Sequence, residues 1–188
     1  MPPTLSALNS SDRATFTAAL GHLFEHSPWV AEETWSQRPF ASTDALHAAL
    51  CTTMRAAPRA RQLALIRAHP DLAGRLARQN QLTPESTREQ ASAGLDRLTD
   101  AELAAFTRLN DTYKARFGFP FIICARLNAK SAIFDAMQTR ITNPPDTEFA
   151  TALGEIEKIA RLRLLDVLEQ NGPRISRIGT DDLNHTLP

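Results

Sequence analysis

The sequence has few cysteines, no excess of charge and no long apolar run, and each of these absences excludes a class of protein. Only two cysteines occur among 188 residues, which excludes the disulfide framework typical of small secreted domains. The 21 basic and 21 acidic residues balance, and no block of like charge indicates a nucleic-acid-binding surface. No stretch reaches the about 18 consecutive apolar residues that a membrane helix requires. A soluble protein with a small-molecule or protein partner is therefore expected.

Motifs for phosphate binding, nucleophilic catalysis and zinc catalysis are also missing. The chain has no glycine-rich phosphate loop, no Gly-x-Ser-x-Gly elbow and no Cys-x-x-Cys pair. His22 and His26 are four residues apart, but Glu25 lies at the wrong position for a zinc-binding helix, so a solvated face is favoured. Cys51 and Cys124 lie in apolar stretches and are expected to be buried, reduced thiols. With no signal peptide and no peroxisomal signal, a cytoplasmic location is predicted.

Proline and capping residues divide the chain into predicted helices. Several prolines occur where a helix would begin, and no segment alternates with period two. The β-favouring run at 119–124 is short and interrupted by proline. We predict an all-α, single-domain bundle of about eight to ten helices over residues 11–172, with an arm at 1–10 and a tail at 173–188. The helices are expected near residues 11–26, 28–37, 44–54, 58–68, 84–90, 99–117, 133–141 and 146–170.

A histidine lies at one of the predicted breaks, in the sequence Arg-Ala-His-Pro-Asp-Leu-Ala-Gly at residues 67–74. The residue before a proline disfavours the α conformation, so the preceding helix should end near Ala68. Pro70 and Asp71 suit the first turn of a new helix, which would place His69 at or near its N-cap. An imidazole held rigidly there suits acid–base chemistry. A structural histidine that caps the turn is the alternative, and spacing alone favours it.

A polar stripe is predicted on the helix that Thr83 and Pro84 begin. Ser86, Glu89 and Gln90 are spaced i, i+3 and i+4, so they share one face. A solvated helix face is the alternative reading, and the pattern alone favours it. The residues predicted to face the core from the opposite side are Ala91, Leu95 and Leu98.

An arginine interrupts the apolar stripe of the last predicted helix. Arg163 lies within that stripe, whereas Arg161 projects to the polar side. A guanidinium there is costly unless it meets an anion, either a carboxylate such as Glu89 or a bound ligand. An arginine at the rim of the core, with its charge in water, is the alternative. The apolar members of the stripe are Phe149, Ala152, Leu153, Ile156, Ile159, Ala160 and Val167.

Several of these segments, in this order, resemble the family of 2-oxo-4-hydroxy-4-carboxy-5-ureidoimidazoline (OHCU) decarboxylases. The likeness covers about residues 10–170, and several ordered motifs are more specific than any one of them. The motifs are Ser-Pro-Trp-Val at 27–30, Arg-Pro-Phe at 38–40, residues 68–74, Ser-Thr-Arg-Glu-Gln at 86–90, residues 116–125, Lys-Ile at 158–159 and residues 161–164.

The resemblance implies a helical bundle that needs no cofactor and forms a homodimer. It implies that His69 is the catalytic histidine, and that Glu89 and an arginine of the last helix complete the catalytic set. Only Arg163, and not Arg161, faces the apolar side, so it is predicted to bind a carboxylate or polarise an oxygen. No metal ligand is expected. The implied substrate-binding residues are Pro70, Ser86, Thr87, Arg88, Glu89, Gln90, Phe121, Ile122, Ile123, Cys124 and Ala125.

The implied reaction is decarboxylation of the ureidoimidazoline to (S)-allantoin in urate degradation. The carboxylated carbon adjoins a ring C=N bond that can accept the electrons released with CO2. His69, expected to have a pKa near neutral, would take or relay the hydroxyl proton and deliver a proton to one face of the resulting carbon. Glu89 would hold the imidazole or a ureido N–H, Ser86 and Gln90 would bind ring and ureido groups, and the main chain of 121–125 would contact the ring.

Two other functions are compatible with the residues alone. In a non-enzymatic helical binding module, the polar stripe would contact a protein and Arg163 would be a structural ion-pair partner. Another reaction of a ureide, such as hydrolysis, is disfavoured because the chain lacks a nucleophile triad and a metal-ligand set.

Overall fold

Helices account for all the regular secondary structure of residues 3–74 and 82–169, the part of the chain that the computed structural model describes. This confirms the predicted all-α class. The helices are α1 (Leu5–Ser10), α2 (Arg13–Leu20), α3 (Trp29–Thr34), α4 (Thr43–Ala56), α5 (Arg59–Ala68), α7 (Pro84–Ser92), α8 (Asp100–Phe117), α9 (Lys130–Arg140) and α10 (Pro145–Glu169), with the short 3-10 turns η1 (Gly21–Leu23), η2 (Trp35–Gln37) and η3 (Ala125–Leu127).

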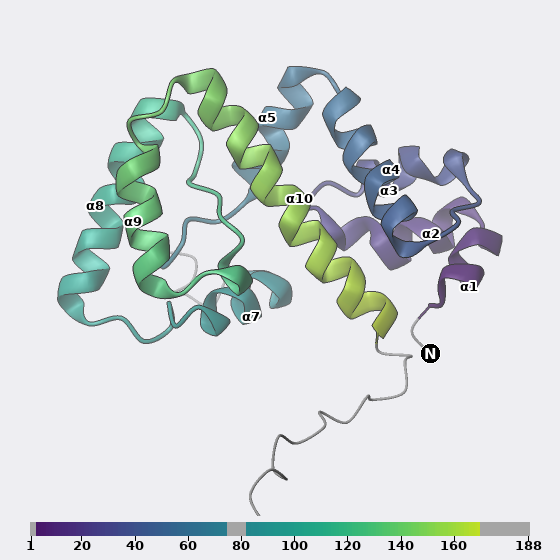
Figure 1. Ribbon diagram of the computed structural model, residues 1–188, viewed down its shortest axis with the longest axis horizontal. Coiled ribbons are helices and arrows are strands. Elements are labelled where there is room, and N and C mark those ends of the chain that lie inside the picture. The colour runs from purple at the N-terminus through teal and green to yellow at the C-terminus, as the bar shows by residue number, and fades with distance from the viewer. Residues whose placement is uncertain (1–2, 75–81, 170–188) are drawn as a thin grey trace, which may run out of the picture.

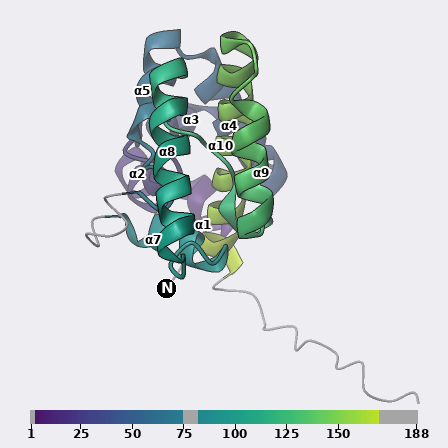
Figure 2. The same ribbon diagram turned by 90° about the vertical axis from the view of Figure 1, so that its left-hand side faces the viewer.

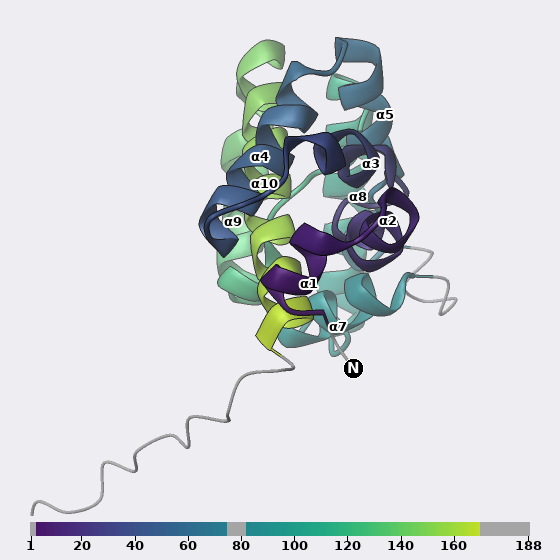
Figure 3. The same cartoon turned by 90° about the vertical axis from the view of Figure 1, so that its right-hand side faces the viewer.

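The long helix α10 runs diagonally through the middle of the molecule (Figure 1). On one side of it, α8 and α9 lie next to each other, with α7 at their lower end (Figure 2). On the other side, α1 to α4 form a second group, in which α3 packs on α2 and α4 and α4 contacts α10 (Figure 3). The apolar stripe of α10 lies in the interior: six of its seven predicted apolar residues are buried, and Val167 is half-buried.

Capping residues set several helix ends where the sequence predicts them. Ser42 accepts a hydrogen bond from the N–H of Ala45 and begins α4. Thr99 and Glu102 form a reciprocal capping box at the start of α8. Gly118 ends the same helix with a φ of 74°, a left-handed conformation that glycine adopts without steric cost. These predicted ends are confirmed.

The predicted helix over 11–26 is wrong in its length. Helix α2 ends at Leu20, and the chain continues through η1 to a turn in which His26 has a φ of 46°. Gly21 allows this path, because a Cβ there would lie 3.1 Å from the Cβ of Pro28. The four apolar residues on which the prediction rested are nevertheless buried: Phe16, Leu20, Leu23 and Phe24.

Residues 119–124 cross the protein interior without forming a helix or a strand. The ring of Tyr113 in α8 lies 5.3 Å from that of Phe121, and Phe149 in α10 lies 6.2 Å from Phe119. Such aromatic pairs stabilise the segment beyond the apolar area that they bury. Polar side chains fix its main chain, because Arg140 donates to the Ile122 carbonyl over 2.8 Å and Glu155 accepts from the Cys124 N–H over 2.8 Å.

The first ten residues include α1, which packs on the rest of the molecule. Leu8 is buried, and the Asn9 side chain exchanges hydrogen bonds with the main chain of Phe40. Arg38 donates to the carbonyls of Asn9 and Ser11. The predicted tail at 173–188 and the predicted stop at Gly172 lie outside the described residues.

Two other expectations concern the thiols and membranes. Both cysteines are free, as predicted; Cys124 is buried and Cys51 is half-buried. None of the helices described combines the length and apolar composition needed to cross a membrane.

Candidate active site

A pocket lies between α7, α10, the end of α5 and the irregular segment at 121–125. It encloses about 370 Å³ of space between atoms, part of it open to solvent. One wall is apolar, and the other carries a histidine, a glutamate, a glutamine, a serine and an arginine. The lining residues are His69, Pro70, Leu72, Ser86, Glu89, Gln90, Phe121, Ile122, Ile123, Ala125, Ile159 and Arg163.

His69 is buried at the edge of this pocket, with 8% of its surface exposed. Its Nδ1 lies 3.0 Å from the Leu65 carbonyl. A carbonyl only accepts, so Nδ1 carries the proton and Nε2 carries the lone pair. Nε2 is buried and has no hydrogen-bond partner among the described residues. Burial lowers the pKa of His69 to about 4, against the expected value near neutral, so the imidazole is uncharged at pH 7.

The predicted position of His69 at the start of a new helix is wrong. His69 is the C-cap of α5, with extended backbone angles, and residues 70–74 form a turn instead of a helix. Ala73 has a φ of 51°, and two side chains from other helices hold this turn. Gln90 accepts from the Ala73 N–H over 2.9 Å, and Asn110 donates to the Leu72 carbonyl over 2.9 Å. Contacts distant in sequence therefore override the local preference for a helix start.

Helix α7 presents its polar stripe to the interior. Thr83 caps the helix, as predicted, and accepts from the Ser86 N–H over 3.2 Å. Ser86 and Gln90 are buried, and only 13% of the Glu89 side chain is exposed. The prediction that Ala91, Leu95 and Leu98 form the opposite side of the same helix is wrong, because α7 ends at Ser92 and its buried residues are Ser86 and Gln90. Leu95 is nevertheless buried in the core and Leu98 packs against it, as predicted.

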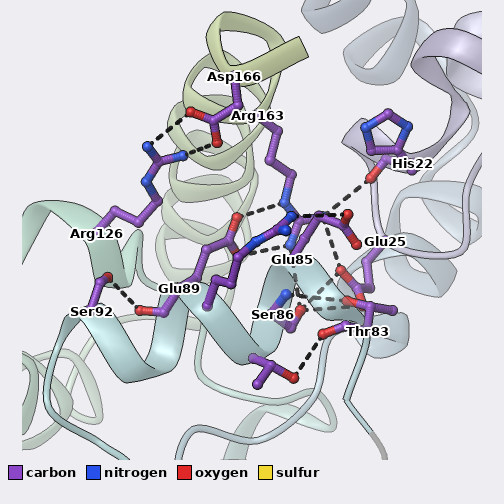
Figure 4. A network of polar contacts seen from close by, with 12 residues as sticks. His22, Glu25, Thr83, Glu85, Ser86, Glu89, Ser92, Arg126, Arg163 and Asp166 are labelled. Carbon is purple, nitrogen blue, oxygen red and sulfur yellow. Dashed lines mark hydrogen bonds and ion pairs between the residues drawn. The ribbon is translucent and has the colours of Figure 1, made fainter. Parts of the chain in front are cut away.

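Arg163 reaches from α10 to α7 and is 3% exposed (Figure 4). Its Nε and one terminal nitrogen bind both oxygens of Glu89 over 2.7 and 2.8 Å. The remaining N–H groups go to Glu25, the His22 carbonyl and Ser86. These five hydrogen bonds equal the donors of a guanidinium. The prediction that Arg163 meets a carboxylate is confirmed, whereas Arg161 is part-exposed and pairs with Asp44 near the surface.

Glu25 is the polar side chain that the sequence does not indicate. The predicted solvated face is wrong for this residue: it is 3% exposed and binds Arg163 over 3.0 Å and Thr83 over 3.0 Å. Burial alone would raise its pKa, but the charge of Arg163 and hydrogen bonds from Arg163 and Thr83 bring the pKa below its ordinary value. Glu25 follows η1, where the chain leaves the helix, so a helical projection cannot locate it.

The segment 121–125 forms the apolar wall, and all five of its residues are buried. The Ile122 carbonyl and both main-chain polar groups of Cys124 already have partners in the protein. Burial raises the pKa of the Cys124 thiol to about 11, so the thiol is neutral at pH 7. Cys124 does not line the pocket, although its neighbours on both sides do.

The structure does not bring every predicted residue to the pocket. Thr87 and Arg88 are exposed, since they lie on the outer face of α7. Thr87 donates to the Thr83 carbonyl and Arg88 pairs with Glu85. Arg88 borders a separate polar hollow beyond Glu89, where Arg126 binds Asp166 through two hydrogen bonds (Figure 4).

The arrangement combines an uncharged base, a fixed carboxylate and an apolar wall. The lone pair of His69 can accept a proton, and the negative charge of Glu25 favours the resulting imidazolium. Ser86 and Gln90 offer hydrogen bonds for a polar heterocycle. Within residues 3–74 and 82–169, no three His, Cys, Asp or Glu side chains are grouped as a metal site would require. Fold and site together define an all-α protein whose pocket is lined by an uncharged histidine and a carboxylate.

Comparison with known proteins identifies the family. The sequence model of the family described as OHCU decarboxylase matches residues 9–165. A 2-oxo-4-hydroxy-4-carboxy-5-ureidoimidazoline decarboxylase of Halalkalicoccus jeotgali is 47% identical over 161 residues, which cover 86% of this chain and 89% of that protein. The mouse protein of the same name is 41% identical over 161 residues, which cover 86% of this chain and 90% of the mouse protein. The chain belongs to the OHCU decarboxylase family.

Solved structures agree in fold. The crystal structure of an (S)-allantoin synthase superposes with a TM-score of 0.70 at 32% identity, over 89% of this chain and 54% of that one. An OHCU decarboxylase crystallised in the presence of (S)-allantoin superposes with a TM-score of 0.63 at 22% identity, over 85% of this chain and 99% of that one. At that identity, the second likeness supports the fold alone.

Proposed function

We propose that this protein decarboxylates 2-oxo-4-hydroxy-4-carboxy-5-ureidoimidazoline to (S)-allantoin in urate degradation, with His69 as its general base and acid. Membership of the family supports the reaction. The observation that carries the role of His69 is the orientation of its ring, since the bond from Nδ1 to the Leu65 carbonyl leaves an uncharged Nε2 at the pocket.

The reaction requires one acceptor for the electron pair of the broken bond and two proton transfers. When the C–CO2 bond breaks, its electron pair moves toward the adjoining ring C=N bond, and the nitrogen takes up one proton. His69 accepts the proton of the hydroxyl group through Nε2. The hydroxyl carbon then becomes a carbonyl, and the imidazolium returns the proton to one face of the neighbouring ring carbon. A single proton donor on one side of a flat intermediate accounts for one enantiomer.

The other pocket residues hold the substrate and the base. Glu89 is held in place at both oxygens by Arg163 and can accept a ureido N–H. We assign Arg163 to holding Glu89 and Ser86, because all its donors are engaged. Gln90 uses its oxygen to fix the Ala73 turn, and its amide nitrogen donates one hydrogen bond to the Asp71 carbonyl over 3.5 Å. Its second amide N–H is the one to offer to a substrate carbonyl.

The main chain of the apolar wall contributes less than the sequence suggests. The Ile122 carbonyl binds Arg140 and the Cys124 N–H binds Glu155. Phe121 and Ile123 line the pocket, and no partner for the main-chain groups of either residue is found among the described residues. We therefore assign the main-chain contact with the heterocycle to Phe121 and Ile123.

A matched pair of histidine variants tests the proposal. The unstable substrate is generated from urate with the two preceding enzymes, and formation of (S)-allantoin is followed by circular dichroism. His69→Asn should lower the catalysed rate by about 10²- to 10⁴-fold, the usual contribution of general acid–base catalysis. His47→Asn is the control, because His47 also binds a main-chain carbonyl, that of Glu157, away from the pocket. Wild-type rates in the His69 variant would refute the assignment.

The family membership and the inward polar stripe of α7 argue against a non-enzymatic module, in which Ser86, Glu89 and Gln90 would face a partner. A homodimer and a cytoplasmic location belong to the proposal as well, supported by the family resemblance and by the composition. Light scattering on the purified protein tests the first, and cell fractionation tests the second.

A further inference from the structure

Glu25 is buried beside the pocket without lining it. Its two oxygens accept hydrogen bonds from Arg163, Thr83 and Ser86 over 3.0 to 3.4 Å. Two of these partners, Arg163 and Ser86, do line the pocket. Figure 4 shows Glu25 and Glu89 on opposite sides of the Arg163 guanidinium. Glu25 therefore acts on the pocket only through its contacts with Arg163 and Ser86.

The charges of this cluster do not balance. Arg163 contributes one positive charge, and the two carboxylates that bind it contribute two negative charges. Glu89 alone, bound at both oxygens, would neutralise the arginine. A second buried carboxylate is costly unless another cation compensates it. The neutral His69 is the titratable group in the same pocket that can become such a cation.

Other charged groups near His69 and Glu25 act in known directions. Burial lowers the pKa of His69; the charge of Glu25 opposes this fall, whereas the charges of Arg163 and His26 add to it. His22 lies near by, and its carbonyl accepts from Arg163. The negative charge of Glu25 is thus a contribution that favours the imidazolium.

We propose that Glu25 is a positioning residue of this reaction, which orients Arg163 and Ser86 from behind and stabilises the imidazolium of His69 while it carries the hydroxyl proton. The inference rests on the proposed function. When Nε2 takes the proton, the net charge of His69, Glu25, Glu89 and Arg163 goes from −1 to 0, and it returns to −1 when the proton passes to carbon. The pocket is electrostatically balanced only while the proton is in transit, as catalysis by preorganised charge requires.

The variant Glu25→Gln, which removes the charge and retains the size, tests this role. We expect kcat at pH 7 to fall about tenfold, the change that corresponds to one pKa unit in the stability of the imidazolium. KM should stay within about twofold, since Glu25 does not line the pocket. The acid limb of the kcat profile should move to lower pH, because loss of the negative charge lowers the pKa of His69.

Two further variants keep the test decisive. Glu25→Asp retains the charge but withdraws it from Arg163, so it should show the same pattern to a smaller extent, even if the glutamine variant does not fold. Glu157→Gln is the control, because Glu157 pairs with Arg55 of α4 and does not line the pocket; it should leave kcat, KM and the pH profile unchanged. Circular dichroism and melting curves establish that each variant is folded.

The outcomes separate this inference from the proposed function. No turnover by the wild-type protein refutes the function itself. Turnover by the wild type with unchanged kcat and an unchanged acid limb in both Glu25 variants overturns the role of Glu25 alone. A fall in kcat without movement of the acid limb, or a rise in KM that accounts for the loss, assigns Glu25 a purely structural role and also overturns the inference.

Discussion

Replacing Arg163 by methionine removes the cation that two buried carboxylates share. Methionine has a similar length and fits an apolar stripe, so the change removes charge and hydrogen bonds more than volume. The side chains of Arg163 and Glu25 are 3% and 2% exposed, and that of Glu89 is 13% exposed. Breaking a buried ion pair by removing one partner costs about 3–5 kcal/mol, because the other charge stays buried. We expect Arg163→Met to lower the free energy of unfolding by that amount.

Arg161→Met is the matched control on the same helix. Arg161 is 30% exposed and its partner Asp44 is 80% exposed. A surface ion pair of this kind contributes about 0–1 kcal/mol. Urea unfolding at pH 7, followed by far-ultraviolet circular dichroism, compares the two variants with the wild type. Equal losses, or a larger loss for Arg161→Met, would refute the reasoning. The rate of (S)-allantoin formation should rank the variants in the same order.

The difference between Arg163→Met and the wild type should depend on pH. In the wild type, Arg163 holds the pKa of Glu25 below its ordinary value, so the stability from Glu25 is present above that ordinary value and is lost as pH falls through the lowered pKa. In the variant, burial without a counter-charge raises the pKa of Glu25. In that variant, the contribution of Glu25 to the free energy of unfolding is lost as pH rises through its raised pKa. The stability gap should be widest near neutral pH and should narrow in acid.

Three further predictions concern stability at other positions. Because burial lowers the pKa of His69 from about 6.5 to about 4, the protein takes up a proton on unfolding between these pH values. The free energy of unfolding should therefore fall by about 3 kcal/mol as pH drops from 6.5 to 4. In urea titrations at several pH values, His69→Asn should reduce this dependence of the free energy of unfolding on pH. Thr99→Ala should cost about 1 kcal/mol through loss of the capping box, against no more than about 0.5 kcal/mol for exposed Thr112→Ala, and a Tm difference below about 1 °C would contradict this. Gly118→Ala should destabilise by about 1 kcal/mol because of its left-handed φ, whereas Gly154→Ala inside α10 should stabilise by about 0.5–1 kcal/mol; shifts of the same sign in thermal melts would disprove the contrast.

Local signals predicted most of the helices. Ser42, Thr99 and Gly118 act within one helical turn of their own positions, so their capping roles can be read from neighbouring residues. Arg163 was also predictable, because a guanidinium inside an apolar stripe requires an anion. Helix α10 has 25 residues, so the phase of its apolar stripe can be read from the sequence.

The sequence failed where distant contacts decide the conformation. The turn after His69 depends on Gln90, which accepts a hydrogen bond across 17 positions of the chain, and on Asn110, which donates one across 38 positions. Glu25 follows the end of a helix, where a periodic pattern no longer states which way a side chain points. The inward face of α7 was misassigned because its buried residues are polar, and polar residues at helical spacing are typical of a solvated face.

The ion cluster also has an order in time. Glu25 and Glu89 precede Arg163 by 138 and 74 residues, so both carboxylates leave the ribosome before their shared cation is made. Until α10 is in place, bringing Glu25 together with Glu89 of α7 would bury two like charges without compensation. Docking of α10 supplies the missing cation, so the helix that completes the charge cluster is also the helix that lies between the two groups of helices.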